Sequence, residues 1–178
     1  MKRTLKKYLT IGIPIIALSG FAVSNANAIT QSISATVTFL TPLSITTVVN
    51  ANFGYVTAAV ASTVYALDTA NTVTVTSGPG ASVGGTPASA SMKILGSATQ
   101  TIDISVGGYT TDHTVVPSLA VCKYGGASQV LCTDATMTGA AAPGAAGTTL
   151  GLGMTITAAN VADGTVATPS FTVTVVYN

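Results

Sequence analysis

The sequence predicts an all-β fold, an antiparallel sandwich of roughly seven or more short strands. Apolar and polar residues alternate with a period of two along most of the chain, whereas a helical period is hard to find. Clusters of Gly, Pro, Asn and Asp interrupt these runs at short intervals, as the turns of a sandwich require. Threonine often fills the polar positions, which suits the outer face of a strand without charged residues.

The first 28 residues predict a secretory signal peptide that is cleaved after Ala28. MKRTLKKY is a basic segment, LTIGIPIIALSGFAV is an apolar segment, and Ala26 and Ala28 form an A-x-A cleavage site. The apolar segment is shorter than the roughly 20 residues that span a membrane, and no second one follows. We therefore expect a secreted protein with no membrane span in the mature chain. An uncleaved N-terminal anchor is the alternative.

Cleavage leaves residues 29–178, which we expect to form a single domain with its own core. This part has two Lys and five Asp, hence a net charge of −3, and no basic cluster that favours nucleic acid as a partner. Its two cysteines, Cys122 and Cys132, are close in sequence and flank Gly125-Gly126. In an exported chain this spacing predicts a disulfide that closes one hairpin. Two free thiols or a metal pair are the alternatives, although a metal needs more ligands nearby.

The alternating runs assign the strands in chain order. The first covers residues 33–39, before Pro42 interrupts the pattern. Further runs cover residues 43–45, 72–76, 88–94, 101–106 and 150–156. The last run ends the chain and places four apolar residues on one face, Phe171, Val173, Val175 and Tyr177. Residues 139–147, GAAAPGAAG, are expected to form a surface loop.

Groups that could support catalysis are few. Residues 29–178 contain one histidine, His113, and no Glu. His113 follows Asp112, and neighbouring residues of a strand point to opposite faces, so we expect no joint action on a substrate. Motifs such as G-x-S-x-G, H-E-x-x-H and C-x-x-C are absent from the sequence. We therefore expect no enzyme, no catalytic residue, no metal site and no cofactor.

Several blocks of the sequence follow one another in a characteristic order. They are Ala35-Thr36-Val37, Pro42-Leu43-Ser44-Ile45-Thr46, Asn52-Phe53-Gly54, residues 90–106 and residues 147–178, which close on Tyr-Asn. Together they cover nearly all of residues 33–178 and resemble a family of secreted bacterial proteins called domain of unknown function 4402. The chain is also broadly similar to spore-coat-U-like and chaperone–usher pilin subunits. It departs from the family pattern at YVTAAVASTVYALDT, where a glycine-rich turn is expected, and in its Cys122–Cys132 pair.

The resemblance implies an immunoglobulin-like sandwich of about seven to nine strands, located in the periplasm, on the bacterial cell surface or outside the cell. In pilin-like relatives, an N-terminal donor strand of one subunit completes the sandwich of its neighbour. Residues 29–40 are then the donor, and the C-terminal strand borders the acceptor groove. The implied assembly residues are Ile33, Ala35, Val37, Phe39, Phe171, Val173, Val175 and Tyr177. Alternatively, residues 33–39 are the first strand of a self-complete domain and pair with the C-terminal strand.

These observations favour a non-catalytic structural subunit of a bacterial extracellular fibre, of the pilus or fimbria type, or of a surface coat. The implied partners are further copies of the chain or other surface subunits, a periplasmic chaperone and an outer-membrane usher. The alternative is a secreted adhesin or glycan-binding module that uses the sandwich loops. Tyr55, Tyr109 and Tyr124 lie near predicted turns, although tyrosines there commonly pack with their hydroxyl in water.

Overall fold

The computed structural model describes residues 32, 34–132 and 137–178. The predicted signal peptide with Ala26 and Ala28 lies outside these residues, as does Ile33. The chain divides into two compact units between Val37 and Thr38. All strands of the described part belong to the second unit, Thr38–Asn178, and the fold is that of this unit.

The second unit is all-β, as the alternation predicts, and its strands pair in antiparallel fashion. In the described part of the chain the strands are β1 (Ser44–Val49), β2 (Tyr55–Val56), β3 (Thr63–Leu67), β4 (Val73–Ser77), β5 (Ser82–Gly84), β6 (Ala90–Leu95), β7 (Ile102–Thr110), β8 (Val116–Tyr124), β9 (Val130–Leu131), β10 (Met137–Ala140), β11 (Thr148–Ala158) and β12 (Ser170–Tyr177). Four of them have only two to four residues, β2, β5, β9 and β10, which is why the number exceeds the prediction.

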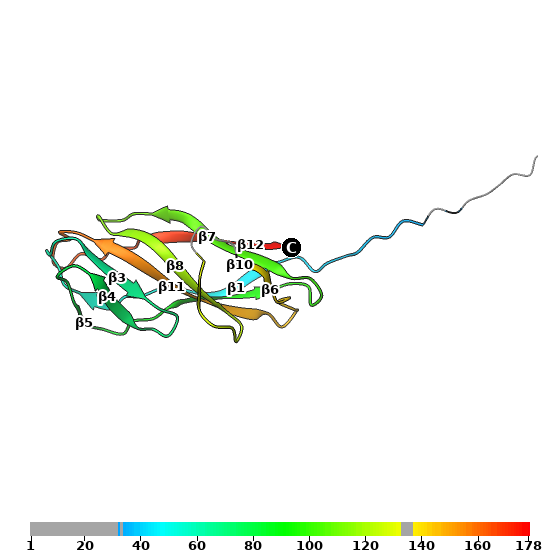
Figure 1. The fold of residues 1–178 in the computed structure, drawn as a ribbon, viewed down its shortest axis with the longest axis horizontal. Coiled ribbons are helices and arrows are strands. Elements are labelled where there is room, and N and C mark those ends of the chain that lie inside the picture. Colours follow the sequence, from blue (N-terminus) through cyan, green and yellow to red (C-terminus); the bar gives the residue numbers. More distant parts are fainter. Residues whose placement is uncertain (1–31, 33, 133–136) are drawn as a thin grey trace, which may run out of the picture. The chain divides into compact units, whose positions relative to one another are not determined.

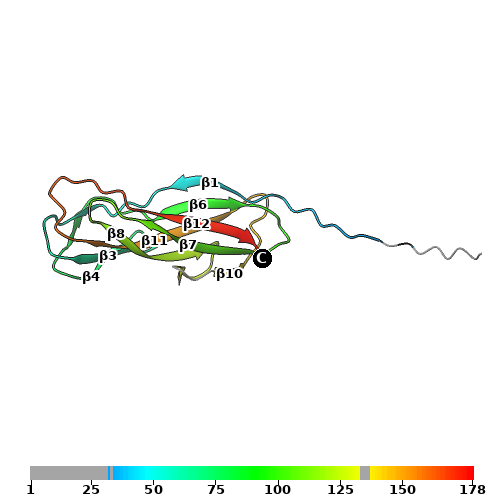
Figure 2. The same cartoon turned by 90° about the horizontal axis from the view of Figure 1, so that it is seen from above.

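Two layers form the sandwich (Figures 1 and 2). The larger sheet has the order β1-β6-β11-β3-β4, with β8 on the other side of β11 and β9 next to β8. The smaller sheet has the order β10-β7-β12, and β2 and β5 form a separate pair. The antiparallel sandwich predicted from the sequence is confirmed at this level, whereas immunoglobulin-like connectivity stays a prediction.

Strand β11 is the centre of the larger sheet because it pairs with three strands. Its first half, Thr148–Leu152, pairs with β6, and its second half, Met154–Ala158, pairs with β3 on the same edge. Gly153 lies between these halves, and a Cβ there would come within 2.2 Å of the Leu67 carbonyl oxygen of β3. Glycine at this position therefore lets the end of β3 approach β11 closely, just beyond the half that pairs with β6.

The core lies between the layers and is aliphatic. Its fully buried members include Ile94 of β6, Ile102 and Ile104 of β7, and Leu150 and Leu152 of β11. Burial of one such side chain contributes about 1.5–3 kcal/mol. These residues are the apolar members of the runs predicted at 88–94, 101–106 and 150–156, so the sequence alternation identified the inner face of each strand correctly.

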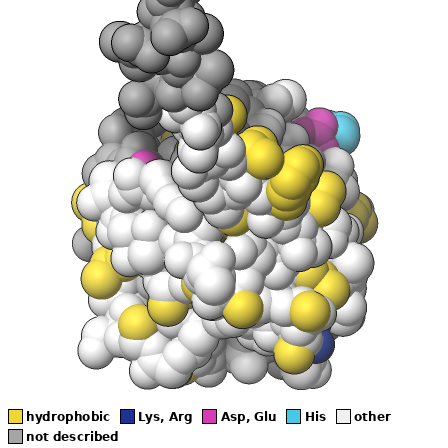
Figure 3. All heavy atoms as spheres, turned by 90° about the vertical axis from the view of Figure 1, so that its right-hand side faces the viewer, with side chains coloured by type: hydrophobic (Ala, Val, Ile, Leu, Met, Phe, Trp, Pro, Cys, Tyr) yellow, Lys and Arg dark blue, Asp and Glu magenta, His cyan; other side chains and the backbone are white. Residues whose placement is uncertain are grey.

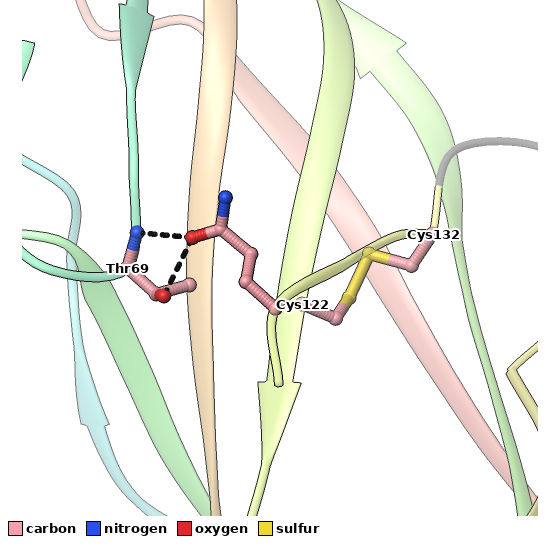
Figure 4. Close-up of a disulfide and its surroundings, with 4 residues drawn as sticks. Thr69, Cys122 and Cys132 are labelled. Carbon is pink, nitrogen blue, oxygen red and sulfur yellow. Dashed lines mark hydrogen bonds between the residues drawn. A yellow bond between two sulfur atoms is a disulfide. The ribbon is translucent and has the colours of Figure 1, made fainter. Parts of the chain in front are cut away.

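The disulfide predicted between Cys122 and Cys132 is present. Cys122 lies on β8 and Cys132 follows β9, so the bond closes the β8–β9 hairpin around the turn at Gly125. Both sulfurs belong to residues that are buried in the core. The Gln129 side-chain carbonyl accepts hydrogen bonds from the Thr69 amide, at 2.9 Å, and from the Thr69 hydroxyl, at 2.6 Å (Figure 4). The hairpin is thus fastened to the turn between β3 and β4.

Removing the disulfide is expected to lower the free energy of unfolding by about 3 kcal/mol, because it restores freedom to a short loop in the unfolded chain. Urea titration of the Cys122→Ala/Cys132→Ala variant measures this loss. Gln129→Ala is the matched control, since it removes only the exposed hydrogen bonds to Thr69 and should cost less than about 1 kcal/mol. Equal stability of the double variant and the parent chain would contradict the prediction.

Candidate strand-acceptor groove

The inner face of β12 is only half covered. Val175 of β12 lies directly opposite Ile104 of β7, and Val173 lies opposite Val106. Cross-strand neighbours share one face of the sheet, so these residues face the same core. Ile104 is 0% exposed and Val106 is 2% exposed, whereas Val173 and Val175 are only half-buried. Core-facing residues of β12 therefore retain contact with solvent.

The same asymmetry occurs at β1, the edge strand of the other sheet. Ile45 of β1 pairs with Ile94 of β6 and shares its face. Ile94 is completely buried, yet Ile45 is 43% exposed. All six residues of β1 are exposed. An apolar residue that faces the core is thus left uncovered at this edge too.

Between these two edges lies an open groove with a volume of about 420 Å³. Strands β1 and β12 belong to different layers but lie on the same side of the sandwich (Figures 1 and 2). Residues of β1, β6, β12 and the chain before β1 line the groove, namely Leu43, Ser44, Ile45, Ile94, Val173, Thr174 and Val175. None of them is charged, and the larger side chains are aliphatic. The groove thus suits an uncharged, largely apolar guest.

Both walls of the groove carry an unused strand edge. Within the described residues, β12 pairs only with β7, and β1 pairs only with β6. β12 contains no Pro and no charged residue over its eight residues. Such edges are templates for pairing with another strand unless they are protected. A guest in extended conformation could therefore pair with backbone groups of β12, of β1 or of both.

The edge of β8 is protected, in contrast. The disulfide-linked strand β9 covers Val121 and Cys122 of β8. Farther along the edge, Pro117 lacks a backbone donor, and Lys123 adds a charge. The fold therefore shields the β8 edge by the usual devices and leaves β12 without them.

The alternating segment before Pro42 does not form a strand in this chain. Residues 34–40 lie outside all strands, and β1 begins only at Ser44. The interpretation of residues 33–39 as the first strand, paired with the C-terminal strand, is wrong for its described residues, because residues 34–39 belong to no strand. Val37 is 69% exposed and Phe39 is 88% exposed, and Ala35 is exposed as well. The donor interpretation stays a prediction.

Asp112 and His113 lie together, contrary to the expectation from the sequence. They occupy the turn between β7 and β8, where His113 has a left-handed φ of 47°, so strand alternation does not separate their side chains. The His113 Nδ1 lies 2.8 Å from an Asp112 carboxylate oxygen. The other oxygen accepts hydrogen bonds from the amide and hydroxyl of Thr168. The Thr168 amide and then His113 lower the pKa of Asp112, and the group ties the turn to the loop before β12.

The three tyrosines considered for glycan binding do not form one site. Tyr124 is buried, burial raises the pKa of its hydroxyl, and that hydroxyl donates a hydrogen bond to the Ala141 carbonyl. Tyr109 is half-buried and packs against Phe171. Tyr55 is exposed, on β2. A shared aromatic binding surface therefore does not follow from these residues.

Charged groups are sparse on the surface that Figure 3 presents, where most side chains are neutral polar or apolar.

The described residues contain no cluster of three or more His, Cys, Asp or Glu side chains placed to hold a metal ion. None of the described segments forms a helix that is long and apolar enough to cross a membrane.

Comparison of the chain with protein-family models, curated proteins and solved structures gives no match. The resemblance described from the sequence blocks therefore stays a prediction.

Proposed function

We propose that the protein is a non-catalytic structural subunit of a bacterial extracellular fibre or surface coat. Copies are joined when residues 29–40 of one copy enter the groove between β1 and β12 of the next. One observation carries this proposal. The same chain has both an uncovered apolar groove and an exposed segment with apolar residues. Export by the predicted signal peptide and the chaperone and usher partners belong to the proposal on sequence grounds alone.

The groove and the segment match in chemistry. Alternation in the segment places Ile33, Ala35, Val37 and Phe39 on one face, and the groove offers apolar side chains from both walls. Neither partner contains a charged side chain, so insertion buries no unpaired side-chain charge. The segment has 12 residues and β12 has eight, so the guest is long enough to follow the whole strand.

Insertion also explains why two open edges are tolerated. An added strand can use the hydrogen-bonding groups of β12, as in other cases of strand addition. Its apolar face would then cover Ile45, Val173 and Val175. The exposed edges that would otherwise promote unspecific aggregation become the specific joint between subunits.

The place where the N-terminal segment joins the domain favours an open-ended assembly. Thr41, where the N-terminal segment reaches the domain, lies beside Tyr177 at the C-terminal end of β12. A guest strand that runs antiparallel to β12 has its own C-terminal end near Ser170, so its domain follows at that end. Each subunit is then joined to its two neighbours at opposite ends of β12. Such head-to-tail contacts generate a filament when the rotation between subunits does not close a ring.

The test is the assembly state of the chain from Ile29 with and without residues 29–40. We expect the chain from Ile29 to form polymers whose length rises with concentration, measured by sedimentation velocity and electron microscopy. The chain from Thr41 should keep the circular dichroism of the β-sandwich, because residues 34–40 contribute no strand, and should remain monomeric.

A mixture of the two chains separates specific assembly from aggregation. The shortened chain keeps its groove but lacks the segment, so each copy should terminate a polymer at one end. An equimolar mixture is therefore expected to give much shorter polymers than the chain from Ile29 alone. A monomeric chain from Ile29 at all concentrations, or polymers that persist without residues 29–40, would overturn the proposed function.

A further inference from the structure

The hydroxyl of Tyr177 joins three segments that are distant in sequence. It donates a hydrogen bond to the Thr41 carbonyl, at 2.5 Å, and accepts one from the Ser97 amide, at 2.6 Å. Thr41 precedes β1 by three residues, Ser97 belongs to the loop between β6 and β7, and Tyr177 ends β12. One side-chain oxygen therefore holds the end of the C-terminal strand to the chain that leads into the first strand.

The surrounding residues fix this tyrosine in place. The Tyr177 ring packs against the main core cluster, and the Asn178 amide donates a hydrogen bond to the Thr101 carbonyl, at 3.1 Å. Gly96 leaves room for the hydroxyl, since a Cβ at that position would come within 2.5 Å of the Tyr177 oxygen and 2.9 Å of Leu43. The packing of the Tyr177 ring and the hydrogen bond of Asn178 therefore hold the contact in place. A larger residue at position 96 would force Tyr177 or Leu43 to move.

The chain changes from exposed to half-buried at this contact. Phe39 and Leu40 are exposed and outside any strand, whereas Leu43, three residues after Leu40, is half-buried against the core and lines the groove. Pro42 between them has no amide with which to form a backbone hydrogen bond. The hydrogen bond to the Thr41 carbonyl thus lies at the boundary between the exposed segment and the folded domain.

We propose that Tyr177 is a positioning residue that anchors the root of the N-terminal segment, so that the end of β12 determines where this segment leaves the domain. The hydroxyl acts on the backbone of Thr41 and not on its side chain, so the anchor is independent of the residue type at that position. This role concerns the isolated chain and does not depend on the proposed assembly.

The test is Tyr177→Phe in the full chain, a substitution that keeps the ring and removes both hydrogen bonds. Parent and variant are compared at a concentration at which sedimentation velocity shows both to be monomeric. We expect the ordered part of the chain to begin at Ser44 and no longer at Thr41. The ¹⁵N heteronuclear NOE at Thr41 and Leu43 should then drop to the value observed at Thr38. Loss of a hydrogen bond of this kind should also raise the rate of chymotrypsin cleavage after Leu43 roughly tenfold. Cleavage after Phe39 should be unchanged.

Tyr124→Phe is the matched control, because its hydroxyl also bonds to a backbone carbonyl, that of Ala141, and makes no contact with the segment root. It should lower stability by a similar amount without changing the NOE at Thr41 or the cleavage after Leu43. The same NOE and cleavage pattern in both variants would overturn the proposal. Loss of the fold in Tyr177→Phe would overturn it as well, since the hydroxyl would then support the whole sandwich and not the root of the segment.

Discussion

Phe39→Asp is expected to abolish polymer formation while the melting temperature of the domain stays unchanged. Phe39 is 88% exposed in the single chain, so a charge there costs the isolated domain little. In the assembly the same side chain would enter an apolar groove without a charged partner, and burial of an unpaired carboxylate costs several kcal/mol. A penalty of this size raises the concentration needed for assembly by about a hundredfold or more. Sedimentation velocity over a concentration series measures the shift.

Leu131→Asp is the control for this substitution. Leu131 is also a large exposed apolar residue, at 56% exposure, but it lies on β9 at the protected edge. The variant should polymerise like the parent chain. Equal loss of assembly in both variants would indicate association through exposed apolar residues in general, and unimpaired polymers of Phe39→Asp would remove the segment from the interface.

Moving residues 29–40 from the N-terminus to a position after Asn178 is expected to give a monomer that is more stable than the shortened chain from Thr41. A hairpin loop of about four residues would let the moved segment return antiparallel along β12 and fill the groove of its own chain. Covering the half-exposed faces of Ile45, Val173 and Val175 should stabilise the domain by about 2–4 kcal/mol, which corresponds to a rise of about 10 °C in melting temperature. Calorimetry and sedimentation measure the two effects.

The matched control carries Asp in place of Val37 and Phe39 within the moved segment. It has the same length and loop but an inner face that the apolar groove disfavours, so its melting temperature should equal that of the chain from Thr41. If both fused chains melt at the same temperature as the shortened one, the groove does not accept this segment.

The sequence predicted the strands that carry continuous alternation, and it missed others for identifiable reasons. The runs at 88–94, 101–106, 150–156 and 171–177 match β6, β7, β11 and β12 in position and inner face. Strands β2 and β9 have two residues each and are too short to show a period. Strand β3 does alternate, with Thr63, Tyr65 and Leu67 buried, so its pattern was open to prediction and was missed.

The expectation from strand alternation was wrong at Asp112 and His113, where the chain forms a turn. Neighbouring side chains such as those of Asp112 and His113 point to opposite faces only on extended backbone, and His113 adopts a left-handed conformation. The hydroxyl of Tyr177 could likewise not be assigned from the sequence. Its partners, Thr41 and Ser97, lie 136 and 80 residues away along the chain.

The sequence by itself determined that the fold is all-β, which residues of β6, β7, β11 and β12 face inward, and that Cys122 and Cys132 close a hairpin. These features depend on residues that are near one another in the chain. Only the tertiary structure decided that the faces of β1 and β12 are left uncovered. Alternation determines the face to which a side chain points, but the coverage of that face depends on which distant strand pairs beside it. In this protein, β12 pairs with β7 on one edge and with none of the described strands on the other.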